Sequence, residues 1–147
     1  MGDLVLETER LVLRKLDDSD AELQFRRLNT AAVMEHLGGP IELHEIEAKH
    51  AKSMANFARE GFGFMMMMEK RTGDMVGHCG FKRVDHPEAP NKGDMEIGWL
   101  ICEDRWRRGY AMEAATAIRD LAFASYDAPL LVALTSQGNV GSWRIME

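Results

Sequence analysis

Cysteine is scarce in this sequence, and the two that occur, Cys79 and Cys102, lie within short apolar runs. This placement lacks the regular spacing of a disulfide framework or of a zinc site, so both thiols are predicted to be buried packing residues. The five histidines also lack paired ligand spacing, and no metal is predicted. These features are typical of a protein from a reducing compartment, and a cytoplasmic location is expected.

Long hydrophobic runs are absent as well. No apolar stretch approaches the roughly 20 residues that span a bilayer, and the start of the chain lacks a basic segment followed by an apolar one. The formal net charge is -6, with acidic and basic residues mixed along the whole length. That distribution exerts no long-range attraction on nucleic acid or on an anionic membrane, so neither is an expected partner.

The chain has 147 residues and is 46% hydrophobic, which suits one domain with a core and is too short for two. Apolar alternation and short apolar runs predict strands within 4–16, 62–69, 75–81, 95–102 and 129–134. Helical spacing predicts helices after Asp17-Asp18-Ser19, over 42–59 and 109–126, and from Asn139 onward. The fold class is therefore α/β or α+β, with a mixed sheet.

Met65 to Met68 form an unbroken row of thioethers. Consecutive residues of a strand face opposite sides of a sheet, so these four side chains would not converge on a soft metal. They are predicted to pack into the core instead.

The segment Arg105-Trp106-Arg107-Arg108-Gly109 links a predicted strand to a predicted helix. A helix N-terminus exposes unpaired backbone N–H groups, and this segment adds up to three guanidinium groups. Because glycine also lets the backbone approach an anion closely, the turn is predicted to bind phosphate. The alternative is a charged turn that does no more than cap a helix.

The phosphate would not belong to a nucleoside triphosphate or a dinucleotide. The sequence contains no Gly-x-x-x-x-Gly-Lys-Ser/Thr motif, and no Gly-x-Gly-x-x-Gly follows a strand.

Four segments, in this order and spacing, match a known family. They are Leu6-Glu7-Thr8-Glu9-Arg10-Leu11-Val12-Leu13-Arg14, Gly77-His78-Cys79-Gly80-Phe81, Glu96-Ile97-Gly98-Trp99-Leu100 and Trp106-Arg107-Arg108-Gly109-Tyr110-Ala111-Met112-Glu113-Ala114. With them the chain resembles the GNAT superfamily of N-acetyltransferases over nearly its whole length, and within it the branch of ribosomal-protein-alanine acetyltransferases. The resemblance implies a mostly antiparallel central sheet flanked by helices.

The resemblance also implies an acyltransferase that uses acetyl-coenzyme A as cosubstrate. Backbone contacts to the cofactor arm are implied for Ile97, Gly98, Trp99 and Leu100. Contacts around the pyrophosphate are implied for Trp106, Arg107, Arg108, Gly109, Tyr110 and Ala111, and Asn139 would lie beside the arm. The acetyl group would pass directly to an amine, with neither a covalent enzyme intermediate nor a metal.

Two catalytic roles follow from the same resemblance. Glu96 matches a position for the general base that takes a proton from the acceptor ammonium, and Ser142 matches the acid that protonates the leaving thiolate. Glu96 has an alternative interpretation as a solvated strand residue or an ion-pair partner.

Relatives in this family normally continue past Glu147 into two more strands. Residues 1–147 are therefore expected to form a single GNAT-like domain that lacks those strands and is truncated at its C-terminus. An unpaired sheet edge would follow, so a homodimer is expected.

The acceptor stays open among a peptide N-terminus, a polyamine, an amino acid and an antibiotic. A non-catalytic acyl-coenzyme A-binding module and a purely structural interaction domain are the alternatives to an enzyme.

Overall fold

The computed structural model describes residues 2–84, 87–88, 90, 92–125 and 131–132. Their elements are, in chain order, β1 (Leu4–Glu7), β2 (Leu11–Lys15), α1 (Asp20–Arg27), α2 (Leu43–Glu60), β3 (Phe64–Glu69), β4 (Met75–Arg83), β5 (Met95–Ile101), the 3-10 turn η1 (Glu103–Arg105), α3 (Tyr110–Ser125) and β6 (Leu131–Val132). The predicted helix from Asn139 onward lies outside the described residues.

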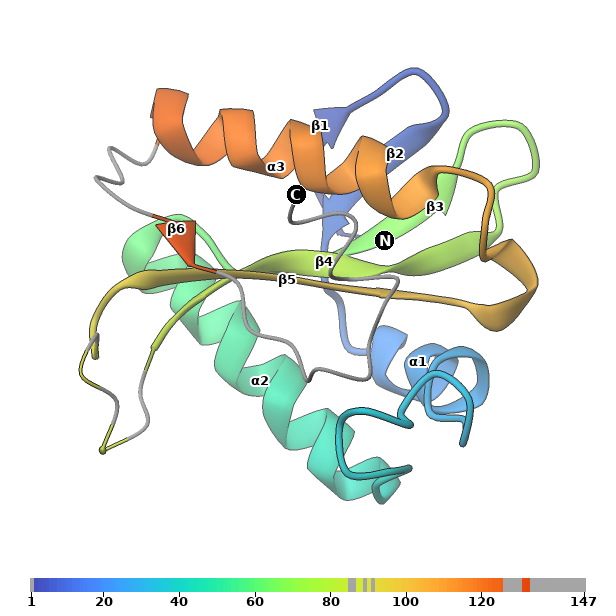
Figure 1. Cartoon of the computed structure of the whole chain (residues 1–147), viewed down its shortest axis with the longest axis horizontal. Coiled ribbons are helices and arrows are strands. Elements are labelled where there is room, and N and C mark those ends of the chain that lie inside the picture. Colours follow the sequence, from blue (N-terminus) through green and yellow to red (C-terminus); the bar gives the residue numbers. More distant parts are fainter. Residues whose placement is uncertain (1, 85–86, 89, 91, 126–130, 133–147) are drawn as a thin grey trace.

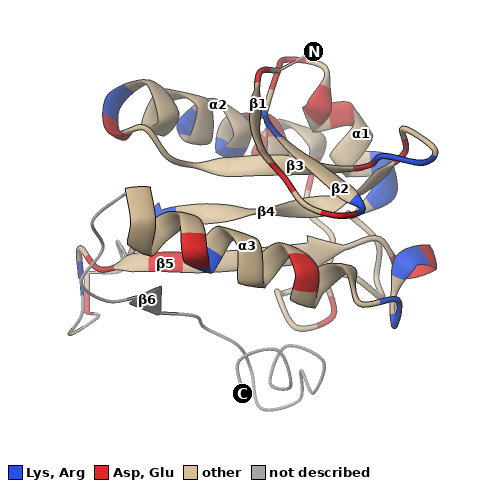
Figure 2. Cartoon of the chain, turned by 90° about the horizontal axis from the view of Figure 1, so that it is seen from above, with Lys and Arg blue, Asp and Glu red and all other residues tan. Residues whose placement is uncertain are grey.

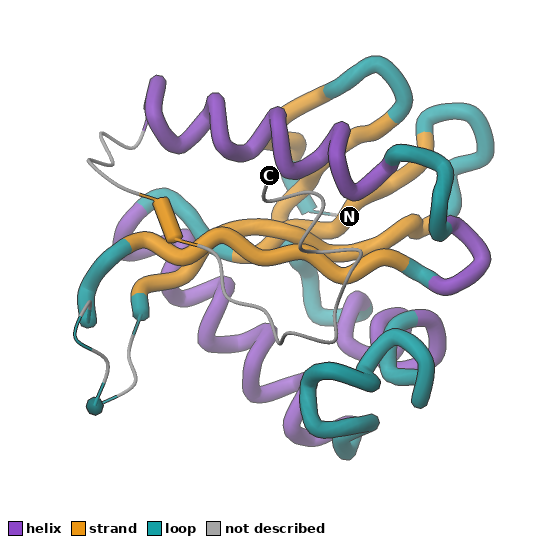
Figure 3. Tube along the Cα trace, viewed as in Figure 1, coloured by secondary structure: helices purple, strands orange, loops and turns teal. Residues whose placement is uncertain are grey.

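A single sheet with the strand order β1-β2-β3-β4-β5-β6 forms the middle layer of the molecule. The first five strands pair antiparallel, and β6 joins β5 in parallel. Helix α3 lies on one side of this sheet, and α1 and α2 lie on the other (Figures 1 and 3). This arrangement confirms the predicted mixed, mostly antiparallel sheet flanked by helices.

The strand predicted within 4–16 is confirmed as β2, but the structure adds β1 before it, and the two strands form a hairpin. A tight turn after Glu7 reverses the chain. Its geometry is set by the backbone N–H of Thr8, which donates to the carbonyl of Leu11, and by the Thr8 hydroxyl, which accepts the N–H of Leu11. Apolar alternation continues across this turn, so the sequence pattern did not reveal it.

Helix α1 is anchored to the sheet by a buried ion pair. Both guanidinium nitrogens of Arg14 on β2 lie 2.8 Å from the carboxylate oxygens of Asp20 at the start of the helix. The two residues are 5% and 2% exposed. The hydrogen bonds that Arg14 donates to Asp20 raise the pKa of Arg14. A bidentate pair of this kind fixes the direction as well as the position of the helix.

The helix predicted over 42–59 is confirmed as α2, which ends at a left-handed glycine. Gly61 has φ 83° and donates its backbone N–H to the carbonyl of Phe57. Only glycine adopts this conformation without a steric penalty, so it ends the helix here.

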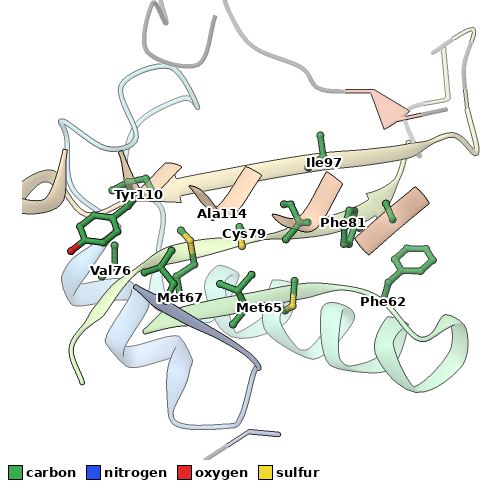
Figure 4. Close-up of a cluster of buried hydrophobic side chains, with 14 of the residues drawn as sticks. Phe62, Met65, Met67, Val76, Cys79, Phe81, Ile97, Tyr110 and Ala114 are labelled. Atoms are coloured by element: carbon green, nitrogen blue, oxygen red, sulfur yellow. The ribbon is translucent and has the colours of Figure 1, made fainter. Parts of the chain in front are cut away.

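The row of methionines packs as predicted. Met65 and Met67 point into the cluster on the α3 side of the sheet, whereas Met66 and Met68 join the second cluster, with Leu23 of α1 and Met54 of α2. In the first cluster, Tyr110 and Ala114 of α3 face Val76, Met67 and Cys79 of the sheet (Figure 4). The two faces of β3 thus pack against both helical layers.

Charges of both signs are distributed over the described part of the chain, and both signs occur on α2 and on α3 (Figure 2). Within the described residues, no helix combines the length and the apolar character that crossing a membrane requires.

Two stacked histidines lie between the sheet and α2. The His78 ring stacks on Phe64, with 4.7 Å between centroids, and on His50, with 6.0 Å. Burial, together with the neighbouring His50, lowers the pKa of His78 to about 3, and burial also lowers the pKa of His50. Both rings are therefore neutral in the folded protein at neutral pH.

Stability is expected to fall as the pH decreases below about 6.5. In the unfolded chain each histidine binds a proton near its ordinary pKa of 6.5, whereas the folded state excludes it. The contribution of each neutral ring to the free energy of unfolding is complete above pH 6.5. As the pH falls toward the pKa of the ring in the folded state, that contribution decreases by up to about 1.4 kcal/mol per pH unit for each ring. Urea unfolding at several pH values between 7.5 and 5.0 measures the slope of the free energy of unfolding against pH.

His78→Phe should reduce that slope, because Phe can stack but cannot titrate. His44→Gln is the matched control, since His44 is exposed, and should leave the slope unchanged. A full slope in His78→Phe would contradict this explanation.

Candidate functional site

The predicted phosphate turn connects η1 to α3. Tyr110 begins the helix, and the backbone N–H of Glu113 donates to the carbonyl of Gly109 as its first helical hydrogen bond, at 3.0 Å. The N–H groups of Tyr110, Ala111 and Met112 therefore have no carbonyl within the helix to accept them. Together they form the positive end of the α3 dipole.

The turn before the helix has an unusual backbone. Arg107 has φ 61° and is the one non-glycine residue with positive φ among those described, and Gly109 has φ 83°. The sign of φ thus alternates from Arg107 to Tyr110, positive at Arg107 and Gly109 and not at Arg108 and Tyr110. This alternation points successive N–H groups toward one concave side, which is a common way of binding an anion. A left-handed arginine costs about 1 to 2 kcal/mol, and such strain tends to persist where function requires it.

Two guanidinium groups accompany these N–H groups. Arg107 and Arg108 are exposed, and in the described part of the chain neither side chain has an acidic partner. The sequence suggested up to three such groups, but Arg105 is already engaged. Its side chain is only 14% exposed and lies 3.2 Å from Asp74 and 3.8 Å from Glu69. Arg105 therefore attaches the turn to the β3–β4 hairpin.

The β1–β2 turn contacts the start of α3 through Arg10. The Nε atom of Arg10 donates to Glu113 at 2.7 Å, its backbone N–H donates to the same carboxylate at 2.9 Å, and its Nη1 atom donates to the carbonyl of Arg108 at 2.8 Å. The hydroxyl of Thr8 also donates to Glu113. Burial alone would raise the pKa of Glu113, but these hydrogen bonds together lower it. The carboxylate is thereby kept ionised and fully bonded.

Tyr110 attaches the first turn of α3 to the sheet. Its ring is buried in the core, and its hydroxyl donates to the buried carboxylate of Glu69 at the end of β3. That hydrogen bond, with another from Thr72, lowers the pKa of Glu69, and the hydrogen bond to Glu69 raises the pKa of Tyr110. The side chain of Tyr110 is thus structural, and only its backbone N–H remains for a ligand.

Strand β5 provides the second half of the site. The whole strand pairs with β4, from Met95 opposite Arg83 to Ile101 opposite Gly77. The described part of β6 pairs only with Met95 and Glu96. Alternate backbone groups of a strand point to opposite neighbours. Between Ile97 and Ile101, the groups on the β6 side therefore have no strand partner among the described residues.

Trp106 joins the two halves of the site. Its indole N–H donates to the carbonyl of Ile101 at 2.8 Å, which ties the turn to the end of β5, while the ring is 43% exposed. The turn and the open strand edge consequently lie at a fixed distance from each other. An extended ligand with an anionic group at one end could contact both.

The side chains of the predicted arm-binding residues face away from this edge. Ile97 and Trp99 contact the core cluster under α3, and Leu100 contacts the cluster under α1 and α2. Gly98 lies opposite Gly80 on β4, beside the ring of Phe64. Because these side chains are packed, only the backbone of β5 remains for a ligand that approaches from its β6 side.

Glu96 pairs with Lys82 directly across the β4–β5 ladder. The Nζ atom of Lys82 lies 3.4 Å from the carboxylate, and the side chains are 12% exposed for Glu96 and 52% for Lys82. The ion-pair interpretation of Glu96 therefore has a partner in the structure. Glu96 lies one residue before the part of β5 that has no partner on its β6 side among the described residues. Asn139 and Ser142 lie outside the described residues.

The sequence patterns did not indicate four residues that anchor the turn or the start of α3 to the rest of the fold: Thr8, Arg10, Glu69 and Glu113. Three of them stand within the motif segments that carry the resemblance, but no local signal showed that they meet.

The two cysteines are buried and free, as predicted, and burial raises the pKa of Cys79 to about 12. Across the described ranges, no three His, Cys, Asp or Glu side chains gather to hold a metal ion.

The geometry agrees with the comparisons with known proteins. Residues 10–147 match the family described as the acetyltransferase (GNAT) domain. The chain is 31% identical to the protein YkkB of Bacillus subtilis (strain 168), over 97% of this chain and 81% of YkkB. The crystal structure of an acetyltransferase from Agrobacterium tumefaciens superposes with a TM-score of 0.83 at 32% identity, covering 99% of this chain and 81% of that one.

A more distant structure shares the fold alone. RimL, a ribosomal L7/L12 α-N-protein acetyltransferase solved in complex with coenzyme A, superposes with a TM-score of 0.79 at 17% identity, covering 97% of this chain and 80% of RimL. From the family match across residues 10–147, together with the sheet and turn described above, this chain belongs to the GNAT acetyltransferase family and is an acetyltransferase.

Proposed function

We propose that the chain binds acetyl-coenzyme A and transfers its acetyl group to a primary amine, either a protein N-terminus or a small amine. The observation that carries this proposal is the turn from Trp106 to Gly109. It combines alternating signs of φ, two exposed arginines that have no acidic partner among the described residues, and the N-terminus of α3. A pyrophosphate is an anion of the size and charge that such a turn binds.

The position of β5 supports the same ligand. The pantetheine arm of coenzyme A carries amide groups that can pair with the backbone edge from Ile97 to Ile101, and Trp106 fixes that edge relative to the turn. Bound in this way, acetyl-coenzyme A would supply an activated thioester near the start of the edge. A backbone N–H there would polarise the thioester carbonyl, as oxyanion-binding groups do.

An amine acceptor is favoured by the charges next to this edge. Glu96 is the acidic side chain on β5 within the described residues, and it can attract an ammonium ion and accept its proton. RimL, which shares the fold, is named as an acetyltransferase of a protein α-amine. Ser142 remains our candidate for protonating the thiolate, and Asn139 for contacting the arm.

Calorimetric titration of the protein with acetyl-coenzyme A tests the binding part of the proposal. The transfer part is tested by adding a panel of amines and measuring the release of the coenzyme A thiol. Saturable binding and acetylation of at least one primary amine are expected. Binding without transfer to any amine would instead support the non-catalytic acyl-coenzyme A-binding module.

Glu96→Gln is expected to lower kcat by roughly 10²- to 10⁴-fold, because the amide cannot take the proton from the acceptor. The dissociation constant of acetyl-coenzyme A should stay within about twofold, since a backbone edge binds the arm. Lys82→Met removes the other half of the ion pair and is the matched control. Equal losses of kcat in the two variants would show that Glu96 acts only as an ion-pair partner.

A further inference from the structure

We propose that Arg10 is a positioning residue for the phosphate turn, so that the β1–β2 hairpin takes part in cofactor binding. This inference rests on the proposed function. It concerns a residue that lies outside the turn and contacts the turn's backbone, not the reacting atoms.

The first step of the argument is the direction of one peptide group. Arg10 holds the carbonyl of Arg108 through its Nη1 atom at 2.8 Å. The described residues contain no cis peptide bond, and in a trans peptide the C=O and the next N–H point in opposite directions. Fixing the Arg108 carbonyl toward Arg10 therefore directs the N–H of Gly109 away from Arg10. That N–H belongs to the alternating segment that is predicted to bind the anion.

The second step concerns an unfavourable charge. Glu113 lies in the first turn of α3, where an unpaired carboxylate would repel an incoming phosphate. Arg10 neutralises it with a guanidinium bond of 2.7 Å and a backbone bond of 2.9 Å. One side chain thus removes the charge that opposes anion binding and orients a group that favours it.

The third step is the rigidity of Arg10 itself. Its guanidinium lies 4.2 Å from the centroid of the buried Tyr110 ring. A Cβ atom on Gly109 would lie 3.3 Å from its Nη2 atom, so the side chain is also closely packed against the turn. The planar guanidinium contacts Glu113, Arg108 and Tyr110 at once, which a lysine ammonium cannot do.

The test compares two acetyl donors that differ in the pyrophosphate. Arg10→Ala should raise the dissociation constant of acetyl-coenzyme A by roughly 10- to 100-fold, as expected for loss of an oriented hydrogen bond to a charged group. The dissociation constant of acetyl-pantetheine, which lacks the pyrophosphate and is followed by NMR titration, should change by less than about twofold. Arg10→Lys should recover only part of the affinity for acetyl-coenzyme A.

Two further variants separate positioning from general destabilisation. Thr8→Val removes another hydrogen bond to Glu113 but leaves the Arg108 carbonyl held. It should lower the melting temperature and keep the affinity for acetyl-coenzyme A. Arg119→Ala makes the same charge change on the exposed part of α3, where Arg119 pairs with Asp120, and should bind as the wild type does.

Equal affinity of the wild type and Arg10→Ala for acetyl-coenzyme A would overturn this inference alone. Equal weakening toward both donors would also overturn it, since that result describes a structural role. Failure of the wild type to bind acetyl-coenzyme A at all would overturn the proposed function and this inference with it.

Discussion

Gly109→Glu is expected to weaken acetyl-coenzyme A binding by more than about 100-fold. The substitution places a carboxylate within the concave turn, at a few ångströms from the phosphate that the turn is proposed to bind. Two unit charges about 4 Å apart repel by roughly 4 kcal/mol near a protein surface, which exceeds the 2.7 kcal/mol that corresponds to 100-fold. Calorimetry at two salt concentrations measures the loss and its screening.

Gly61→Glu is the matched control for this prediction. Gly61 has the same φ of 83° as Gly109, and nothing lies within 4 Å of its Cβ position. Both variants force a non-glycine residue into the left-handed region, at about 1 to 2 kcal/mol of stability. Gly61→Glu should therefore melt at a similarly lowered temperature and still bind acetyl-coenzyme A. Similar affinity in both variants would show that the turn is not the phosphate site.

The largest loss of stability is expected from Asp20→Ala. This change leaves the guanidinium of Arg14 buried at 5% exposure without its bidentate partner. Breaking a buried pair by removing one member costs about 3 to 5 kcal/mol. For a chain of this size the melting temperature should fall by roughly 10 °C or more, as measured by differential scanning calorimetry.

Removing both charges should be far less harmful than removing one. In Arg14→Leu with Asp20→Ala no charge remains buried, so most of the lost melting temperature should return. Asp120→Ala provides the exposed control, because Asp120 is 66% exposed and its pair with Arg119 is solvated. It should show no measurable loss. A double variant no more stable than Asp20→Ala would contradict the charge-burial explanation.

Local features of the sequence predicted most of the elements. The helix that ends at Gly61 and the hairpin between β3 and β4 depend on contiguous residues whose backbone preferences are strong. The hairpin at Thr8 was missed because its turn relies on one hydroxyl and interrupts no apolar pattern. The strand predicted there was therefore confirmed only as β2 and β1 was missed, whereas the fold class was confirmed.

The candidate site likewise has one part that the sequence predicted and another part that it did not. The position of the turn between a strand and α3 could be predicted because a strand, a basic segment with glycine and a helical pattern follow one another directly, and phosphate binding there stays a prediction. The engagement of Arg105 with Glu69 and Asp74 could not be predicted, since it depends on how η1 sits against the β3–β4 hairpin. The sequence therefore suggested three available guanidinium groups at the turn, whereas the described residues leave those of Arg107 and Arg108.

By itself, the sequence determined the order of the elements, the methionine core of β3 and the residues of the turn, because each of these depends on neighbours along the chain. Only the tertiary structure decided which charges meet. Arg10 reaches Glu113 across 103 residues, and Lys82 faces Glu96 through the register of two strands. Such contacts are set by the packing of distant elements, where a shift of one residue in register would move a side chain to the opposite face of the sheet.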